Sequence, residues 1–237
     1  MKSAKIYASS LRRLKRSRGF GVHSPFAFHF ICRTLGERAP YYAYPAIAAS
    51  RSLSLQLAHG VTRHPRIMSE KNAKMLFRVV CRFNPWRIFQ IGGHFGLSTA
   101  AVMAVDSRSK LSCFMPANPH VDIFRCVTAP LADRINYVSD VAEGLRAYAE
   151  STPGTLFVMV CDAVADSPQV TASLCRLISE RECVVAVRNL SKGSALTAPL
   201  WEALKQAMPY GMTFTNGNIG FLVALRHLPV QHFTLWF

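Results

Sequence analysis

The fold is decided by residues 87–104, which read Arg87-Ile-Phe-Gln-Ile-Gly-Gly-His-Phe-Gly-Leu-Ser-Thr-Ala-Ala-Val-Met-Ala104. Ile88 to Ile91 is a short apolar run of the kind that forms a buried parallel strand. A glycine-rich break follows, and helix-forming residues resume at Leu97. A strand, a glycine turn and a helix in this order begin a nucleotide-binding βαβ unit. The pattern therefore predicts a ligand site at the turn.

The spacing of the turn, Gly-x-x-x-Gly from Gly92 to Gly96, narrows the choice of ligand. Glycine lets backbone approach a ligand where a Cβ would clash, and the helix that follows offers unpaired N–H groups. The spacing is not the Gly-x-Gly-x-x-Gly of a dinucleotide site, and no Gly-Lys-Ser/Thr follows as in a P-loop. A tight turn in some other α/β domain is the alternative that this stretch leaves open.

From residue 86 onward the chain alternates strands and helices, which is typical of a parallel sheet covered on both faces. The last two strands are expected to form a hairpin, because Asn216-Gly217 is a hairpin turn signal. The predicted strands are residues 87–91, 111–115, 135–138, 156–161, 183–187, 212–215 and 219–225, and the predicted helices are residues 97–105, 118–127, 141–150, 168–180 and 195–207.

Residues 1–66 are predicted to be a basic, helical N-terminal extension, and residues 67–237 an α/β domain. Ser24 before Pro25 is a good helix N-cap followed by a proline at the first helical position. Residues 69–83 have apolar side chains at helical spacing, so we expect an amphipathic helix that buries this stripe in the core. The stripe consists of Met75, Leu76, Val79, Val80 and Phe83.

The charge of the chain is strongly positive and unevenly placed. It has 28 Lys and Arg residues against 13 Asp and Glu residues, a formal net charge of +15. Residues 1–18 contain seven of these cations and no acid. Such a field favours polyanions, so residues 1–18 are expected to make non-specific nucleic-acid contacts; a solvated tail explains the same charges.

Two absences in the sequence bear on the cellular setting. No apolar run approaches the roughly 18–20 residues that a membrane span requires, and no apolar segment of a signal peptide follows the basic start. The seven cysteines include no Cys-x-x-Cys pair. We therefore expect a cytoplasmic protein with reduced, mostly buried thiols.

Several stretches together resemble one family, the bacterial class I methyltransferases that use S-adenosylmethionine and are related to the catechol-type O-methyltransferases. Gly92–Gly96 looks like motif I of this class, and Arg18-Gly-Phe-Gly-Val-His-Ser-Pro-Phe-Ala-Phe28 looks like the group's N-terminal motif. Residues 75–85, 201–205 and 231–237 are similar to the helix before motif I, the C-terminal helix and the last strand. The resemblance implies a Rossmann-like fold whose seven-stranded, mostly parallel sheet has the order 3-2-1-4-5-7-6, with helices on both faces.

The same resemblance implies where S-adenosylmethionine would bind. The implied cofactor-binding residues are Gly92, Gly93, His94, Gly96, Ser98, Met115, Asp140 and Asp162. Two of the group's acids are replaced, by Gln90 at the end of the first strand and by Met115 where an acid would bind the ribose hydroxyls. Weak or lost cofactor binding is therefore among the expectations. Asp140 also suits a helix N-cap.

The metal site of the catechol-type enzymes is also degraded. Asp162 matches one of their carboxylate ligands, but Ala186 and Val187 occupy the positions of two further acids, and Arg188 adds a cation. Magnesium requires an octahedral set of oxygen ligands. We therefore predict that the chain binds no metal.

The weak candidates for a catalytic role are Asp162, His94 and His23. Asp162 is expected at the end of a strand, where it could act in the pocket or could serve only as a helix cap or turn residue. His94 could face the cofactor or act as a base near neutral pH, or its ring could pack on the strand edge as part of the turn. His23 could line the mouth of the active site or orient its own turn, whereas His232 is expected to be structural.

Two hypotheses of function follow. In the first, the chain transfers a methyl group from S-adenosylmethionine to a small-molecule acceptor without a metal, which requires chiefly that donor and acceptor be aligned. In the second, the fold is kept but the chemistry is lost, and the chain is a binding module for a nucleic acid or a protein partner. The absent acids favour the second, whereas Asp162 and the intact glycine turn favour the first. The sequence names no acceptor and no oligomeric state.

Overall fold

The structure is a computed structural model of the 237-residue chain, and it describes residues 10, 13–63, 65–115, 118–161, 168–190 and 197–237. The helices are α2 (Pro25–His29), its π-helical continuation η1 (Phe30–Leu35), α3 (Tyr44–His59), α4 (Glu70–Phe83), α5 (Leu97–Met103), α6 (Val121–Thr128), the 3₁₀ segment η2 (Ala129–Arg134), α7 (Val141–Ser151), α8 (Pro168–Glu180) and α9 (Thr197–Ala207). The strands are β1 (Arg87–Ile91), β2 (Lys110–Phe114), β3 (Ile135–Val138), β4 (Leu156–Val160), β5 (Cys183–Arg188), β6 (Met212–Thr215), β7 (Ile219–Ala224) and β8 (Gln231–Thr234).

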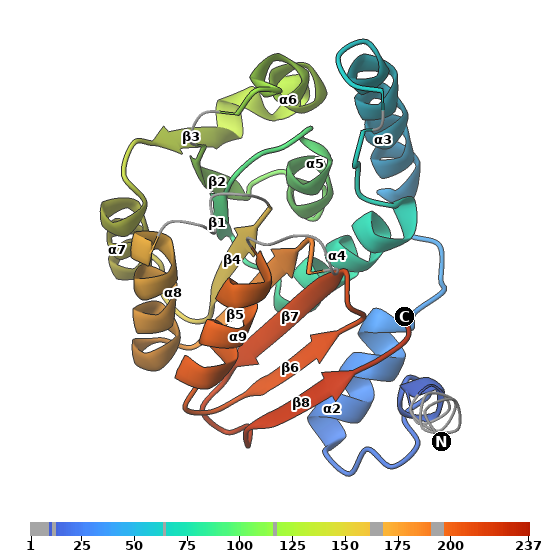
Figure 1. Cartoon of the computed structure of the whole chain (residues 1–237), viewed down its shortest axis with the longest axis vertical. Helices are drawn as coiled ribbons and strands as arrows, with labels where there is room; N and C mark the ends of the chain where they lie inside the picture. The colour runs from blue at the N-terminus through green and yellow to red at the C-terminus, as the bar shows by residue number, and fades with distance from the viewer. Residues whose placement is uncertain (1–9, 11–12, 64, 116–117, 162–167, 191–196) are drawn as a thin grey trace.

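The strands form one sheet of order β3-β2-β1-β4-β5-β7-β6-β8 (Figure 1). The order predicted for the first seven strands is confirmed, and β7 runs antiparallel to both of its neighbours. The predicted number of seven strands is wrong, because β8 pairs in parallel with the outer edge of β6. An added strand satisfies the N–H and C=O groups that an edge strand leaves unpaired. The resemblance likened residues 231–237 to the family's last strand, but the predicted sheet ended with the strand at residues 219–225, so the eighth strand was not counted.

The hairpin between β6 and β7 turns at the predicted Asn-Gly pair. Gly217 has a φ of 89°, in the left-handed region that favours glycine. The Asn216 side chain accepts hydrogen bonds from the backbone N–H groups of Asn218 and Ile219, at 2.9 and 3.0 Å. This local network explains why the dipeptide is a reliable signal: it stabilises the turn without help from the rest of the fold.

Helices cover both faces of the sheet, as the alternation predicted. In Figure 1, α7, α8 and α9 lie on one face, and α4 and α5 lie on the other. Successive residues of a strand point to opposite faces. In β5, Val184 and Ala186 belong to the core shared with α4 and α5, and Val185 and Val187 to the core shared with α7, α8 and α9. The two positions where the sequence comparison placed metal-ligating acids are thus filled by fully buried apolar side chains.

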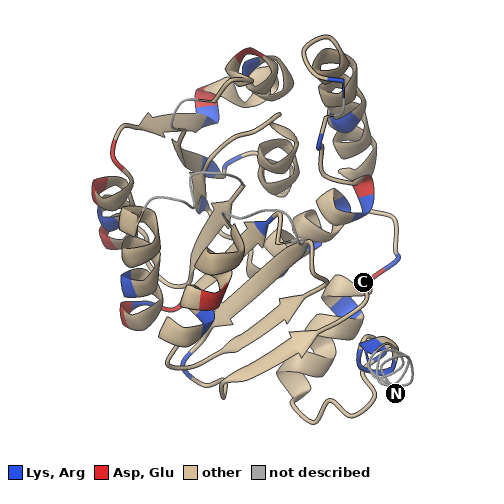
Figure 2. Cartoon of the chain, viewed as in Figure 1, with Lys and Arg blue, Asp and Glu red and all other residues tan. Residues whose placement is uncertain are grey.

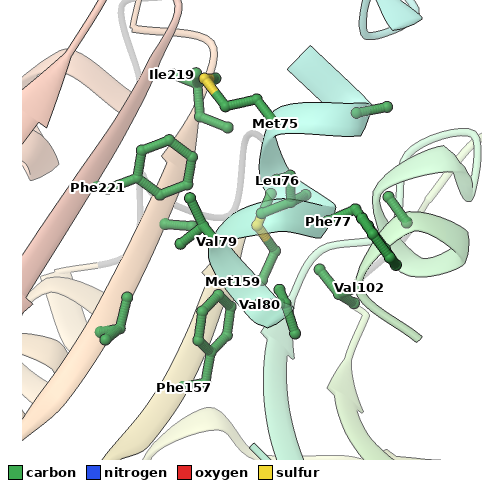
Figure 3. Close-up of a cluster of buried hydrophobic side chains, with 14 of the residues drawn as sticks. Met75, Leu76, Phe77, Val79, Val80, Val102, Phe157, Met159, Ile219 and Phe221 are labelled. Carbon is green, nitrogen blue, oxygen red and sulfur yellow. The ribbon is translucent and has the colours of Figure 1, made fainter. Parts of the chain in front are cut away.

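Helix α4 forms the centre of the first core (Figure 3). Ser69 caps it, since its hydroxyl accepts a hydrogen bond from the N–H of Asn72 at 3.2 Å. The apolar stripe that the sequence predicted is buried against β4, β7 and α5, and Phe83 at its end is partly buried. The residues labelled in Figure 3 are Met75, Leu76, Phe77, Val79, Val80, Val102, Phe157, Met159, Ile219 and Phe221.

The described part of the N-terminal segment packs onto the same core. Ser24 caps α2 as expected, accepting from the N–H of Ala27 at 3.3 Å. The ring centroid of Phe30 lies 4.6 Å from that of Phe214 in β6. Of the basic stretch 1–18, residues 1–9 and 11–12 lie outside the described residues. Ser17, within the described part, accepts a 2.6 Å hydrogen bond from the N–H of Trp236.

Three charged residues lie on the described strands, Arg87 in β1, Lys110 in β2 and Arg188 in β5. Figure 2 shows both signs interspersed on α7 and α8, whereas β6, β7 and β8 carry no charged residue. Among the described helices, none has both the length and the apolar character to cross a membrane.

Candidate active site

The glycine turn leaves the carboxyl end of β1 between two neighbouring strands. β1 pairs with β2 on one side and β4 on the other, so the chain order reverses direction here. Gly92, His94 and Gly96 all have positive φ values, of 78°, 47° and 83°. Only glycine adopts this region without strain, and His is among the residues enriched there. In an open α/β sheet, such a switch point is where ligands bind.

Gln90 fixes the conformation of the turn from inside the protein. Its side chain is fully buried. The amide nitrogen donates to the carbonyl of Gly92 at 2.7 Å, and the amide oxygen accepts from the Thr99 hydroxyl at 3.0 Å. An ionised carboxylate could not donate to that carbonyl. The acid missing from the sequence is thus replaced by a neutral group that joins β1, the turn and α5.

The space beside Gly93 is occupied by the protein itself. A Cβ on Gly93 would lie 2.6 Å from Sδ of Met115 and 2.7 Å from the ring of Phe124. A Cβ on Gly96 would lie 3.1 Å from Cβ of Val127. These glycines are required by the packing of α6 and of the residue after β2. The sequence analysis expected these glycines to leave space for a ligand, but the space at these two positions is taken by protein side chains.

Met115 takes the position where an acid was expected. It is partly buried and packs against the first core. The amide nitrogen of Asn118 lies 3.6 Å from its sulfur and donates a 3.0 Å hydrogen bond to the carbonyl of His94. Asn118 also accepts from the N–H of His120 at 2.9 Å. Asn118 was missed by the sequence reasoning, although Asn-Pro before a helix is a turn signal.

The ring of His94 lies inside the turn rather than in open solvent. It sits edge-on to Phe95, with 4.1 Å between the ring centroids. Burial, with the charges of Arg188 and His120 adding to it, lowers the pKa of His94 from 6.5 to about 3. The ring is therefore neutral at physiological pH, and its conjugate acid is too strong for it to serve as a general base. This agrees with the alternative in which the His94 ring packs as part of the turn.

Arg188 reaches the glycine turn from the end of β5. It is 5% exposed, and its Nη1 donates to Oγ of Ser98 at 2.8 Å; Ser98 itself is 1% exposed. The strand alternation that buries Val184 and Ala186 among α4 and α5 also points Arg188 to that face. The extra cation noted in the sequence thus contacts a predicted cofactor-binding residue.

Asp140, another predicted cofactor-binding residue, serves as a helix cap. Asp140 caps α7: one carboxylate oxygen accepts from the N–H of Glu143 at 2.8 Å, and the other accepts from the side chain of Gln169 at 3.4 Å. Asp162 lies outside the described residues. Among the residues that are described, no group of three His, Cys, Asp or Glu side chains is arranged to hold a metal ion.

The two other histidines that the sequence analysis considered, His23 and His232, lie away from the glycine turn. His23 is exposed, and its neighbour Ser24 contacts Met212 at the start of β6, on the sheet edge opposite the glycine turn. His232 shares a 2.8 Å hydrogen bond with Thr213 of the neighbouring strand. Burial, with the charge of Lys205 adding to it, lowers the pKa of His232. The structure therefore does not bring His23 together with His94.

Comparison with known proteins gives information on the fold. No family model matches the chain, and no curated protein matches it in sequence. Solved structures do match. An O-methyltransferase from Bacillus cereus in complex with SAH is 18% identical, with a TM-score of 0.56 over 74% of this chain and 90% of that one. A methyltransferase from Geobacter sulfurreducens is 17% identical, with a TM-score of 0.53 over 82% and 95%.

A third match is the O-methyltransferase TomG from Streptomyces achromogenes in complex with SAM. It is 16% identical, with a TM-score of 0.51 over 78% of this chain and 91% of that one. At these identities the likeness is one of fold. The chain thus has the Rossmann-like α/β fold of these methyltransferases, with the strand order that the sequence predicted and one additional edge strand.

Proposed function

We propose that this chain is a methyltransferase that uses S-adenosylmethionine and transfers the methyl group to a small-molecule acceptor without a metal ion. The observation that carries the proposal is the glycine turn Gly92–Gly96 at the switch point between β1 and β4, on a fold shared with methyltransferases solved in complex with SAH and SAM. Gln90 keeps this turn in one conformation through buried hydrogen bonds.

Polar groups around the turn support the assignment of the donor site. The Ser98 hydroxyl, the Arg188 guanidinium and the Asn118 amide supply polar groups around the turn. The misfit is at Met115, whose thioether is only a weak acceptor for the ribose hydroxyls. Charge-assisted hydrogen bonds are about twice as strong as neutral ones, so we expect the donor to bind more weakly than at a site with the acid.

The chemistry suits a reaction that depends on alignment. When bound, S-adenosylmethionine supplies an electrophilic methyl group whose sulfur leaves as a neutral thioether when the acceptor's lone pair forms the new bond. The chain's own residues hold the turn and exclude water from it. Because His94 is a poor proton acceptor, we expect acceptors whose nucleophile has lost its proton before transfer or needs to lose none.

Calorimetry on the full chain with SAH tests the proposal. We expect one site with an affinity in the micromolar range. Asn118→Ala removes the hydrogen bond to the His94 carbonyl and should weaken binding, whereas Asn136→Ala, at an exposed position of β3, should leave it unchanged. Absence of binding at high SAH concentration would exclude methyl transfer and would leave the alternative of a fold kept as a binding module.

A further inference from the structure

A small polar cavity lies beside the end of β5. Its volume is about 280 Å³, close to the lower end, about 300 Å³, of the range for small-ligand pockets. Two arginines, Arg66 and Arg188, line it together with Ser69, Asn72 and Asn218. None of its described lining residues is an acid. Ile219, at the top of Figure 3, and Met68 contribute apolar wall.

The buried guanidinium of Arg188 gives the cavity its chemistry. A charge removed from water is costly unless a counter-charge or several hydrogen bonds compensate it. Arg188 is 5% exposed and, within the described residues, donates to the neutral hydroxyl of Ser98. It forms no ion pair with any carboxylate in the described part of the chain. A guanidinium presents five donors in a planar fork that matches a carboxylate or a phosphate.

The other lining groups favour the same kind of ligand. Arg66 is exposed at the cavity and adds a second positive charge. Ser69 is the N-cap of the 14-residue helix α4 and Asn72 lies in its first turn, where the helix dipole favours negative charge. The Glu70 carboxylate of that turn pairs with Lys74 at the side, and neither residue lines the cavity.

The position of the cavity relates it to the glycine turn. Residues 92–96 do not line the cavity. Arg188 connects the two places, because it lines the cavity and donates a hydrogen bond to Ser98, two residues after Gly96. A ligand group held by Arg188 would therefore lie one side chain away from the first turn of α5. This places the cavity beside the donor site rather than within it.

We propose that this cavity binds an anionic group, a carboxylate or a phosphate, of the methyl acceptor. The acceptor is then an acidic small molecule whose charge is anchored by Arg188 and Arg66 while its nucleophile faces the glycine turn. This inference rests on the proposed function, since it names the class of substrate for that site. The carboxylate of the methyl donor is a second source of the same chemistry, and the experiment separates the two.

Methyl NMR on the full chain, labelled at Met and Ile methyl groups, tests for the anion. Sodium phosphate, titrated at constant ionic strength, should shift the signals of Met68 and Ile219 in a saturable way. Arg66→Gln should weaken this affinity about tenfold, because it removes a charge-assisted interaction. Arg63→Gln changes another exposed arginine that does not line the cavity, and it should leave the affinity unchanged. Because Arg66 is exposed, the decisive variant does not disturb the core.

Repeating the titration with donor analogues identifies the source of the anion. If SAH and phosphate bind together, the site is available to an acceptor. If SAH displaces phosphate while 5′-methylthioadenosine, which lacks the carboxylate, does not, the anion is the donor's own and the acceptor assignment is overturned. Unshifted Met68 and Ile219 signals at tens of millimolar phosphate would overturn the anion site itself. Failure of SAH to bind would instead refute the proposed function, and the phosphate result would stand separately.

Discussion

Nη1 of Arg188 and Oγ of Ser98 lie 2.8 Å apart, and this hydrogen bond joins the end of β5 to the first turn of α5 across 90 residues of sequence. Both side chains are buried. The positive charge of Arg188 therefore acts inside the site, where it contributes to the lowered pKa of His94. A residue that the sequence marked only as an extra cation is thus a structural part of the candidate active site.

Met115→Asp should tighten SAH binding about tenfold, because a carboxylate would replace a thioether as the acceptor for the ribose hydroxyls. The Asn118 amide, 3.6 Å from the Met115 sulfur, is placed to donate to the new carboxylate. Calorimetry measures the change. Met115→Leu has a similar size and no charge, so it should bind SAH as the unmodified chain does. Equal affinities for the Asp and Leu variants would show that the ribose does not lie at residue 115.

Gly93→Ala should destabilise the fold by about 1–3 kcal/mol, the usual cost of overpacking a tightly packed site. Its Cβ would meet Met115 and Phe124 at 2.6 and 2.7 Å. Chemical denaturation measures the loss. Gly60→Ala is the matched control, because its nearest neighbour, the Leu57 carbonyl oxygen, is 3.3 Å from the new Cβ. A Gly93→Ala variant as stable as Gly60→Ala would refute the packing of α6 on the turn.

The titration of His94 should make stability depend on pH. Its folded pKa of about 3 lies below the ordinary value of 6.5, so the unfolded state binds more protons between these values. The stabilisation is present above pH 6.5 and is lost as the pH falls toward 3. The loss between pH 7 and pH 4.5 is on the order of 2 kcal/mol.

Comparing variants isolates this contribution. His94→Asn tolerates the positive φ of 47° and removes the titrating ring, so it should lose less stability on acidification than the unmodified chain. His59→Asn changes an exposed histidine at the end of α3 and should follow the unmodified chain. Identical pH profiles for the three proteins, measured by urea unfolding, would place the His94 ring in solvent.

Magnesium and a chelator should have no effect on SAH binding or on any methyl transfer. Ala186 and Val187 are fully buried in the two cores, and Arg188 brings a cation where a ligand oxygen would be needed. Calorimetry in EDTA and in magnesium chloride makes the comparison. An activity that is lost in EDTA and restored by magnesium would show that the chain holds a metal after all.

The basic N-terminal stretch should bind nucleic acid without sequence preference and with a steep dependence on salt, because phosphate contacts release counterions. In filter binding at rising salt, the logarithm of the binding constant should fall less steeply with the logarithm of salt concentration for the Lys2→Gln/Lys5→Gln double variant than for the unmodified chain. Lys110→Gln, an exposed lysine at the start of β2, is the control. If the double variant and the full chain bind equally at every salt concentration, the N-terminal charges are not the contact, and if neither binds at low salt, the proposal fails.

The order of the first seven strands was implied by the family resemblance. The sequence by itself determined the strand and helix alternation, the β6–β7 hairpin and the buried stripe of α4. These features depend on local signals: apolar period, glycine and Asn-Gly turns, and the Ser24 and Ser69 caps. The structure agrees with these local signals because short connections and right-handed crossovers leave few other ways to arrange the same elements. Side-chain parity along β5 would also have placed Arg188 on the face of α4 and α5.

Only the tertiary structure decided what surrounds the glycine turn. Met115 and Phe124 fill the space beside Gly93, Arg188 binds Ser98, and His94 lies against Phe95. Most of these partners are some 20 to 90 residues apart in sequence, and the loops that join them carry no periodic signal. The same holds for β8, whose place in the sheet is set by the free edge of β6 rather than by its own four residues. Contacts of this kind depend on how elements pack in three dimensions, which a local pattern does not specify.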